Sequence, residues 1–165
     1  MAWTIEVLDN DSDARACARL MAGSEPWKTL GRTYEASLAI IRDASREVYV
    51  LRNQDVLGGF LILCLTGAFV GYIQTVCIHP EQRGQGLGSK LVAFAEQRIL
   101  AEFPNVFMCV SSFNQDARRL YERLGYAVVG ELNDYIVQGH SEILLRKTVA
   151  PLTTFVPTRT PASRS

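Results

Sequence analysis

A loop with alternating glycines, between a predicted strand and a predicted helix, constrains this chain more than any other feature. Residues 76–78 end a run of strand-forming residues, glycines occupy every second position over 84–88, and helical spacing of apolar residues begins at Leu87. Glycines let successive backbone N–H groups point inward, and a helix N-terminus adds unpaired N–H groups and a positive dipole end. With Arg83 at its edge, the loop is predicted to bind an anion such as a pyrophosphate.

Two common phosphate-binding motifs do not fit this loop. The dinucleotide fingerprint requires a third glycine at the position of Ser89, and the P-loop requires a Gly-Lys-Ser or Gly-Lys-Thr sequence that the chain lacks. A helix start that only needs a flexible loop remains the alternative, and the glycines alone do not decide between the two.

Length and charge exclude several classes of protein. The 165 residues fit one domain, and 17 basic residues balance 17 acidic ones. A zero net charge argues against nucleic acid as the main partner, because phosphate binding requires a basic excess. We therefore expect a soluble protein that is a monomer or a homodimer, with no nucleic-acid and no membrane partner.

The four cysteines form no Cys-x-x-Cys pair and are predicted to be buried free thiols, three of them within apolar runs. The first residues show no basic segment followed by a long apolar one, so a cytoplasmic location is expected. The apolar run at 56–73 contains four glycines and many β-branched residues, which favours two buried strands over a membrane span.

Periodicity predicts an α+β fold with a mixed, mostly antiparallel sheet of six to seven strands and about four helices. Residues 73–110 read as strand, helix and strand, which predicts one parallel crossover. The predicted strands are 3–8, half-buried with Trp3, Ile5 and Val7 on one side, and then 47–52, 56–65, 69–78, 106–110, 126–129 and 142–145. The first predicted helix is capped by Asp11 or Asp13 and ends at Met21, and the others are 34–41, 86–102 and 114–124.

The composition changes near residue 150. Three of the six prolines lie in the last fifteen residues, among threonines and serines. Such a segment buries little apolar surface. We predict one domain over 1–150 and a dispensable tail over 151–165.

Two blocks of the sequence resemble the GNAT N-acyltransferase superfamily. Residues 83–88 read Arg-Gly-Gln-Gly-Leu-Gly and match its R/Q-x-x-G-x-G/A signature, while Ile78-His79-Pro80 fits the strand end before it. Residues 114–126 resemble its Asn…Ala…Leu-Tyr-Glu…Leu-Gly-Phe helix. The resemblance covers about residues 3–148 and implies the GNAT fold, an α/β/α arrangement in which helices cover both faces of the sheet. It also implies acetyl transfer from acetyl-coenzyme A (acetyl-CoA) to an amine of a small molecule or a protein.

The resemblance also implies which residues bind acetyl-CoA. Backbone groups of the strand end pair with the pantetheine arm, and the glycine loop holds the pyrophosphate. The implied cofactor-binding residues are Val76, Cys77, Ile78, Arg83, Gly84, Gln85, Gly86, Leu87, Gly88, Ser89 and Asn114. Asn114 is equally suited to cap the helix that follows it.

Tyr121 matches the superfamily's general acid, which protonates the departing thiolate; a core tyrosine beside Leu120 and Leu124 is the alternative. Direct attack by the amine needs no covalent enzyme intermediate, so no cysteine nucleophile is expected. With only two histidines, no metal site is predicted.

The general base stays open in the sequence. The ribosomal-protein N-terminal acetyltransferases have a glutamate at the strand position that is Cys109 here. Tyr72 and Gln74 supply no carboxylate. Other candidates are a chain of water molecules or one of Glu25, Glu131, Asp134 and His140. Trp27 is expected either to line the acceptor pocket or to cap the core. An acyl-CoA sensor without turnover is the alternative function.

Overall fold

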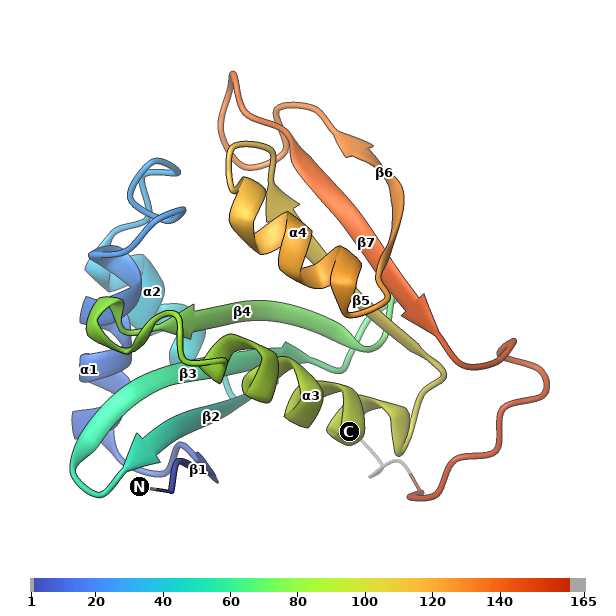
Figure 1. Ribbon diagram of the computed structural model, residues 1–165, viewed down its shortest axis with the longest axis horizontal. Coiled ribbons are helices and arrows are strands. Elements are labelled where there is room, and N and C mark those ends of the chain that lie inside the picture. Colours follow the sequence, from blue (N-terminus) through green and yellow to red (C-terminus); the bar gives the residue numbers. More distant parts are fainter. Residues whose placement is uncertain (1, 161–165) are drawn as a thin grey trace.

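Seven strands form one sheet in the order β1-β2-β3-β4-β5-β7-β6 in the computed structural model, which describes residues 2–160 (Figure 1). The strands are β1 (Thr4–Val7), β2 (Arg46–Asn53), β3 (Val56–Cys64), β4 (Tyr72–Ile78), β5 (Asn105–Ser111), β6 (Ala127–Leu132) and β7 (Glu142–Thr148). The helices are α1 (Asp11–Ala22), α2 (Tyr34–Ile41), α3 (Leu87–Leu100) and α4 (Gln115–Arg123), with a short 3-10 helix at Pro80–Gln82.

The sheet divides at its parallel strand pair. Strand β4 pairs with β5 only at Tyr72↔Phe107 and Ile73↔Met108, and every other strand pair is antiparallel. Beyond those positions the two strands diverge, and Figure 1 shows the gap that opens between β4 and β5. The predicted parallel crossover is therefore confirmed.

Helices cover both faces of the sheet, as predicted. Strand β3 is buried on both sides: Phe60 and Ile62 pack in the cluster with α1 and α2, while Leu61 and Leu63 pack in the cluster with α3. This explains the nearly continuous apolar run at 56–73, which forms β3 and the start of β4. None of the helices within residues 2–160 has the length and apolar character needed to cross a bilayer.

Some predicted details were wrong. Asn10, and neither Asp11 nor Asp13, caps α1, since its side chain accepts a hydrogen bond from the Asp13 N–H at 2.8 Å. Strand β4 begins at Tyr72 instead of position 69, because Gly71 adopts a φ of +99° and its Cα lies so near the Asn105 carbonyl that a Cβ would approach that oxygen to 2.3 Å.

Two more sequence expectations require correction. Val7 points to solvent with 65% of its surface exposed, because β1 is a border strand. All four cysteines are free thiols, yet only Cys17 and Cys77 are buried, while Cys64 and Cys109 are partly exposed.

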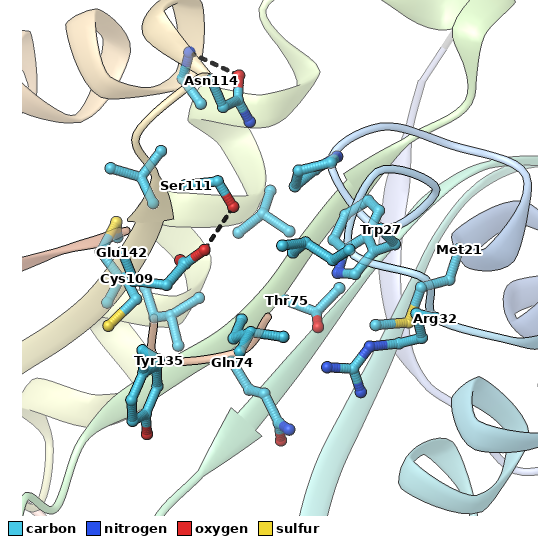
Figure 2. A pocket seen from close by; sticks show the side chains of 18 of the residues that line it. Met21, Trp27, Arg32, Gln74, Thr75, Cys109, Ser111, Asn114, Tyr135 and Glu142 are labelled. Carbon is cyan, nitrogen blue, oxygen red and sulfur yellow. Dashed lines mark hydrogen bonds between the residues drawn. The ribbon is translucent and has the colours of Figure 1, made fainter. Parts of the chain in front are cut away.

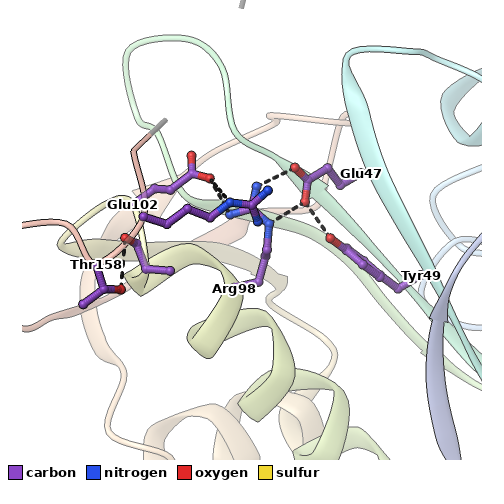
Figure 3. Close-up of polar contacts among 7 residues, drawn as sticks. Glu47, Tyr49, Arg98, Glu102 and Thr158 are labelled. Carbon is purple, nitrogen blue, oxygen red and sulfur yellow. Dashed lines mark hydrogen bonds and ion pairs between the residues drawn. The ribbon is translucent and has the colours of Figure 1, made fainter. Parts of the chain in front are cut away.

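A charged network joins helix α3 to strand β2 (Figure 3). Arg98 donates to the two carboxylate oxygens of Glu47 at 2.7 and 2.9 Å and to Glu102 at 3.0 Å. The Tyr49 hydroxyl donates to Glu47 at 2.7 Å. The carboxylate of Glu102 is only 1% exposed, so Arg98 compensates a buried charge.

The segment after β7 runs back to the end of α3. Its Arg159 N–H donates to the Ala101 carbonyl at 2.9 Å, and the Arg159 side chain lies 3.7 Å from Glu102. Leu152 remains 76% exposed. The predicted tail therefore has few contacts over 151–160, and its last residues, 161–165, lie outside the described part. The domain boundary stays a prediction.

Candidate active site

The diverging part of β4 presents backbone groups to the gap. The His79 N–H donates to the Gly58 carbonyl at 2.8 Å, one position beyond the Ile78↔Gly59 pair. Bonded and unbonded pairs alternate along an antiparallel ladder, so the backbone groups of Val76 and Ile78 point away from β3. The Ile78 carbonyl accepts a bond from Arg83 Nε at 3.4 Å. Val76 thus offers its N–H and carbonyl to whatever occupies the gap.

The glycine loop directs the start of α3 toward the same gap. Gly84 and Gly86 both have a φ of +75°, a left-handed conformation that favours glycine. Gly86 is the N-cap of α3 and supplies no side-chain hydrogen bond. The first N–H groups of the helix, at Leu87, Gly88 and Ser89, therefore lack partners within the helix. This arrangement has the geometry of the anion site that the sequence predicts.

A groove of about 620 Å³ connects these two features. Of the predicted cofactor residues, Gln85 is the one that does not line it, because its amide donates to Gln82 Oε1 at 3.1 Å instead. The groove is lined by Trp27, Val76, Cys77, Ile78, Gln82, Arg83, Gly84, Gly86, Leu87, Gly88, Ser89, Asn114, Asp116, Ala117, Leu120, Tyr121 and Arg123. Arg123 adds a cation at the groove that the sequence analysis did not single out.

Helix α4 places Asn114 and Tyr121 at the inner end of the groove. Asn114 Oδ1 accepts a hydrogen bond from the Ala117 N–H at 3.4 Å, so Asn114 is the helix cap. Burial raises the pKa of Tyr121 to about 12, so its phenol keeps its proton at neutral pH. The Tyr121 ring packs edge-on against Tyr126, with 6.2 Å between ring centroids.

A second, smaller cavity of about 270 Å³ adjoins the groove at Asn114 and Tyr121 (Figure 2). Five residues line both spaces: Trp27, Val76, Asn114, Ala117 and Tyr121. The cavity is otherwise formed by the end of α1, the loop between α1 and α2, strands β4 and β5, the segment that precedes β7 and the first residue of β7. Trp27 thus lies at the cavity, one of the two positions considered for it.

Glu142 is the carboxylate of this cavity. It is only 4% exposed, and its Oε1 accepts a 2.6 Å hydrogen bond from the Ser111 hydroxyl. Burial raises the pKa of Glu142, and the Ser111 bond partly offsets that shift. In Figure 2 its carboxylate lies beside Cys109 of β5. The cavity therefore contains a buried carboxylate at the start of β7.

The sequence analysis missed Glu142. The residue was recognised only as the start of a strand, and the pairing Ser111↔Glu142 joins positions far apart in the chain. The four residues considered as bases, Glu25, Glu131, Asp134 and His140, line neither the groove nor the cavity. Two of them are engaged locally: Glu25 accepts from Thr29 Oγ1 at 2.7 Å, and Asp134 accepts from the Gly139 N–H at 2.7 Å.

The cysteines near the site are poor nucleophiles. Burial raises the pKa of Cys77 to about 12 and also raises the pKa of Cys109. The thiolate is the reactive form, so neither side chain is activated at neutral pH. Within residues 2–160, no group of three or more metal-ligating side chains comes together.

A divided sheet with a glycine loop at the division is the arrangement expected of the acyl-CoA-dependent transferases that the sequence resembles. The sequence profile of the Acetyltransferase (GNAT) family matches residues 11–126. The chain belongs to this family, which confirms the resemblance.

Known relatives agree with this assignment. Blasticidin-S acetyltransferase of Streptomyces morookaense is 32% identical over 90 residues, which are 50% of this chain and 66% of that protein. The chain spans 50–66% of the length of the curated relatives it matches.

Solved structures show the same fold. A GNAT-family protein described as a possible acetyltransferase, from Desulfovibrio desulfuricans, is 19% identical with a TM-score of 0.75, over 90% of this chain and all (100%) of that one. An aminoglycoside 6'-N-acetyltransferase complexed with coenzyme A is 16% identical with a TM-score of 0.71, over 90% of this chain and 98% of that one.

Proposed function

We propose that the protein transfers the acetyl group of acetyl-CoA to an amine by direct attack in a complex that holds both substrates. One observation carries the proposal: the groove and the cavity meet at a wall that contains Val76, Asn114 and Tyr121. A thioester in the groove and an amine in the cavity would meet at that wall.

The groove fits acetyl-CoA in two respects. The uncapped start of α3, with the glycine loop over 83–89, suits a pyrophosphate. The outward backbone groups of Val76 and Ile78 suit the amide groups of the pantetheine arm. When bound, acetyl-CoA supplies an activated acyl group and a thiol leaving group with a parent pKa of ~8.5. The Val76 N–H would donate to a carbonyl oxygen that gains negative charge.

Glu142 and Tyr121 divide the proton transfers. Glu142 accepts a proton from the attacking amine nitrogen, and its raised pKa brings it closer to the pH at which a base is efficient. Tyr121 keeps its proton until the carbon–sulfur bond breaks and then assists the departing thiolate. The new amide bond forms as the thioester bond breaks, so no enzyme-bound acyl group is required.

The test is free-thiol release from acetyl-CoA with a panel of amines, for the wild type and for Tyr121→Phe. The variant keeps the ring and loses the hydroxyl, so we expect unchanged acetyl-CoA affinity and a kcat lower by ~10²–10⁴-fold. An unchanged kcat would make Tyr121 a core residue. If acetyl-CoA raises the melting temperature but no amine releases thiol, the protein is an acyl-CoA sensor instead.

A further inference from the structure

A cation without a counter-charge lies in the acceptor cavity. Arg32 belongs to the loop between α1 and α2, where its N–H donates to the Trp27 carbonyl at 2.9 Å. Its guanidinium is partly buried and forms no ion pair or hydrogen bond with another residue within 2–160. Burial lowers the pKa of Arg32, yet a guanidinium stays charged at any ordinary pH.

Two polar groups of β4 lie at the same side of the cavity. Gln74 Oε1 accepts a 2.7 Å hydrogen bond from Arg46 Nε, which leaves the amide NH₂ of Gln74 as a donor. Thr75 is 3% exposed, and its hydroxyl has no hydrogen-bond partner among the described residues. Figure 2 shows the Arg32 guanidinium directed toward β4 near both groups, while Glu142 lies on the other side of the cavity.

These groups form a donor set for an anion. Arg32, the Gln74 amide and the Thr75 hydroxyl can all donate, and a carboxylate accepts several hydrogen bonds with a planar geometry that matches a guanidinium. Arg32 and Glu142 are the only charged side chains among the described residues that line the cavity. A polycationic acceptor would place a positive charge next to Arg32. The cavity would offer it a single carboxylate, that of Glu142, which already serves as the proposed base.

We propose that Arg32, with Gln74 and Thr75, binds a carboxylate of the acceptor, so that the substrate is an amine that also carries an acid group. This inference rests on the proposed acetyl transfer. The amine would lie toward Glu142 and Tyr121 and the carboxylate toward Arg32. The cavity of about 270 Å³ suits an amino acid or the end of a short peptide.

Matched pairs of acceptors test the inference. The probes are the twenty amino acids, ω-amino acids of three to six carbons and glycine-ended dipeptides, each beside its own carboxamide. We expect kcat/KM to favour the acid of the preferred pair by about tenfold to a hundredfold. Arg32→Gln should remove that preference through KM, with little change for the carboxamide. Lys28→Gln removes an exposed cation from the same loop, outside the cavity, and should keep the preference.

Wild-type turnover without any acid preference would overturn the inference and leave acetyl transfer in place. If no probe is acetylated, binding can still be measured from the melting temperature of the protein with coenzyme A and each probe. If the acid raises the melting temperature more than its carboxamide in the wild type but not in Arg32→Gln, the inference is supported although the proposed reaction fails. If acid and carboxamide raise the melting temperature of the wild type equally, the inference is overturned. If Arg32→Gln does not fold, Gln74→Leu is expected to weaken the same preference, and an unchanged preference would contradict the inference.

Discussion

The groove and the cavity are built in different ways. The groove offers backbone groups from the open side of β4, two glycines at positive φ and the first turn of α3. The cavity offers side chains that come from β4, β5, the start of β7, the segment before it and the loop before α2. Ten of the seventeen residues that line the groove lie within 76–89, whereas the cavity exists only after the two parts of the sheet come together.

This contrast separates two kinds of specificity. Every residue type except proline has the same backbone groups. Binding in the groove should therefore depend on the backbone conformation and tolerate many side-chain substitutions. Side-chain groups change with each substitution, so the cavity can accept a different amine without altering the groove. Variants of the two regions should therefore affect different measurements.

The largest expected effect is on turnover. Glu142→Gln keeps the size of the side chain and the hydrogen bond to Ser111 but removes the base, so kcat should fall by ~10²–10⁴-fold with unchanged acetyl-CoA affinity. Steady-state kinetics and an acetyl-CoA titration measure both quantities. Glu131→Gln, at an exposed position outside both spaces, is the control. Equal kcat values for the two variants would exclude Glu142 as the base.

The next effect is on acetyl-CoA binding. Gly86→Glu introduces a negative charge where the pyrophosphate is proposed to bind, and affinity should fall on the order of a hundredfold, the effect of about 3 kcal/mol of repulsion. Gly139→Glu is a matched control, because Gly139 also has a positive φ (+87°) and open space around it but lies outside the groove. Ser89→Ala should change affinity by less than about twofold, because the Ser89 N–H remains.

A smaller effect concerns pH. Glu142 must be ionised to accept a proton, so activity should rise with pH through its raised pKa. The Ser111 hydrogen bond stabilises the ionised form. Ser111→Ala should therefore raise the pKa further and move the acidic limb of the kcat/KM profile to higher pH. The amine's own ionisation is the same in both proteins. A limb that stays in place or moves to lower pH would contradict this assignment.

The smallest effect should come from the tail. Truncation after Ala150 removes Arg159, whose side chain is 62% exposed and lies 3.7 Å from Glu102. The free energy of unfolding, measured in urea, should therefore fall by less than about 1 kcal/mol, and activity should be unchanged. Arg98→Met removes the buried partner of the same carboxylate and should cost about 3 kcal/mol. If truncation lowers the free energy of unfolding as much as Arg98→Met does, the residues after 150 are part of the domain.

The sequence predicts most of the fold, for a physical reason. Helix α2 was predicted at its observed bounds, and α3, α4 and β5 within a few residues, because their apolar periodicity reflects the faces they bury. The predicted cap of α1 was wrong, since Asn10, Asp11 and Asp13 are all residue types that cap helices well and only the backbone geometry distinguishes them.

Only one part of the candidate site could be predicted from the sequence. The glycine loop could be predicted because a backbone site needs a contiguous segment with a recognisable conformation. Glu142, Arg32 and Thr75 could not, because the importance of each depends on which distant residues line the same space. A single sequence does not reveal strand register, and it was the Ser111↔Glu142 pairing that showed where the carboxylate lies.

The divided sheet also has a consequence for solubility. A strand edge with unpaired N–H and C=O groups at the border of a sheet invites other chains to pair with it, which leads to aggregation. Here the open edge of β4 lies in the interior of the sheet, and residues of α3 and α4, such as Leu87 and Leu120, line the approach to it. A slender ligand can reach this edge, whereas a strand that belongs to another sheet would collide with the helices. The interior edge of β4 is thus open to a slender ligand but not to a strand of another protein molecule.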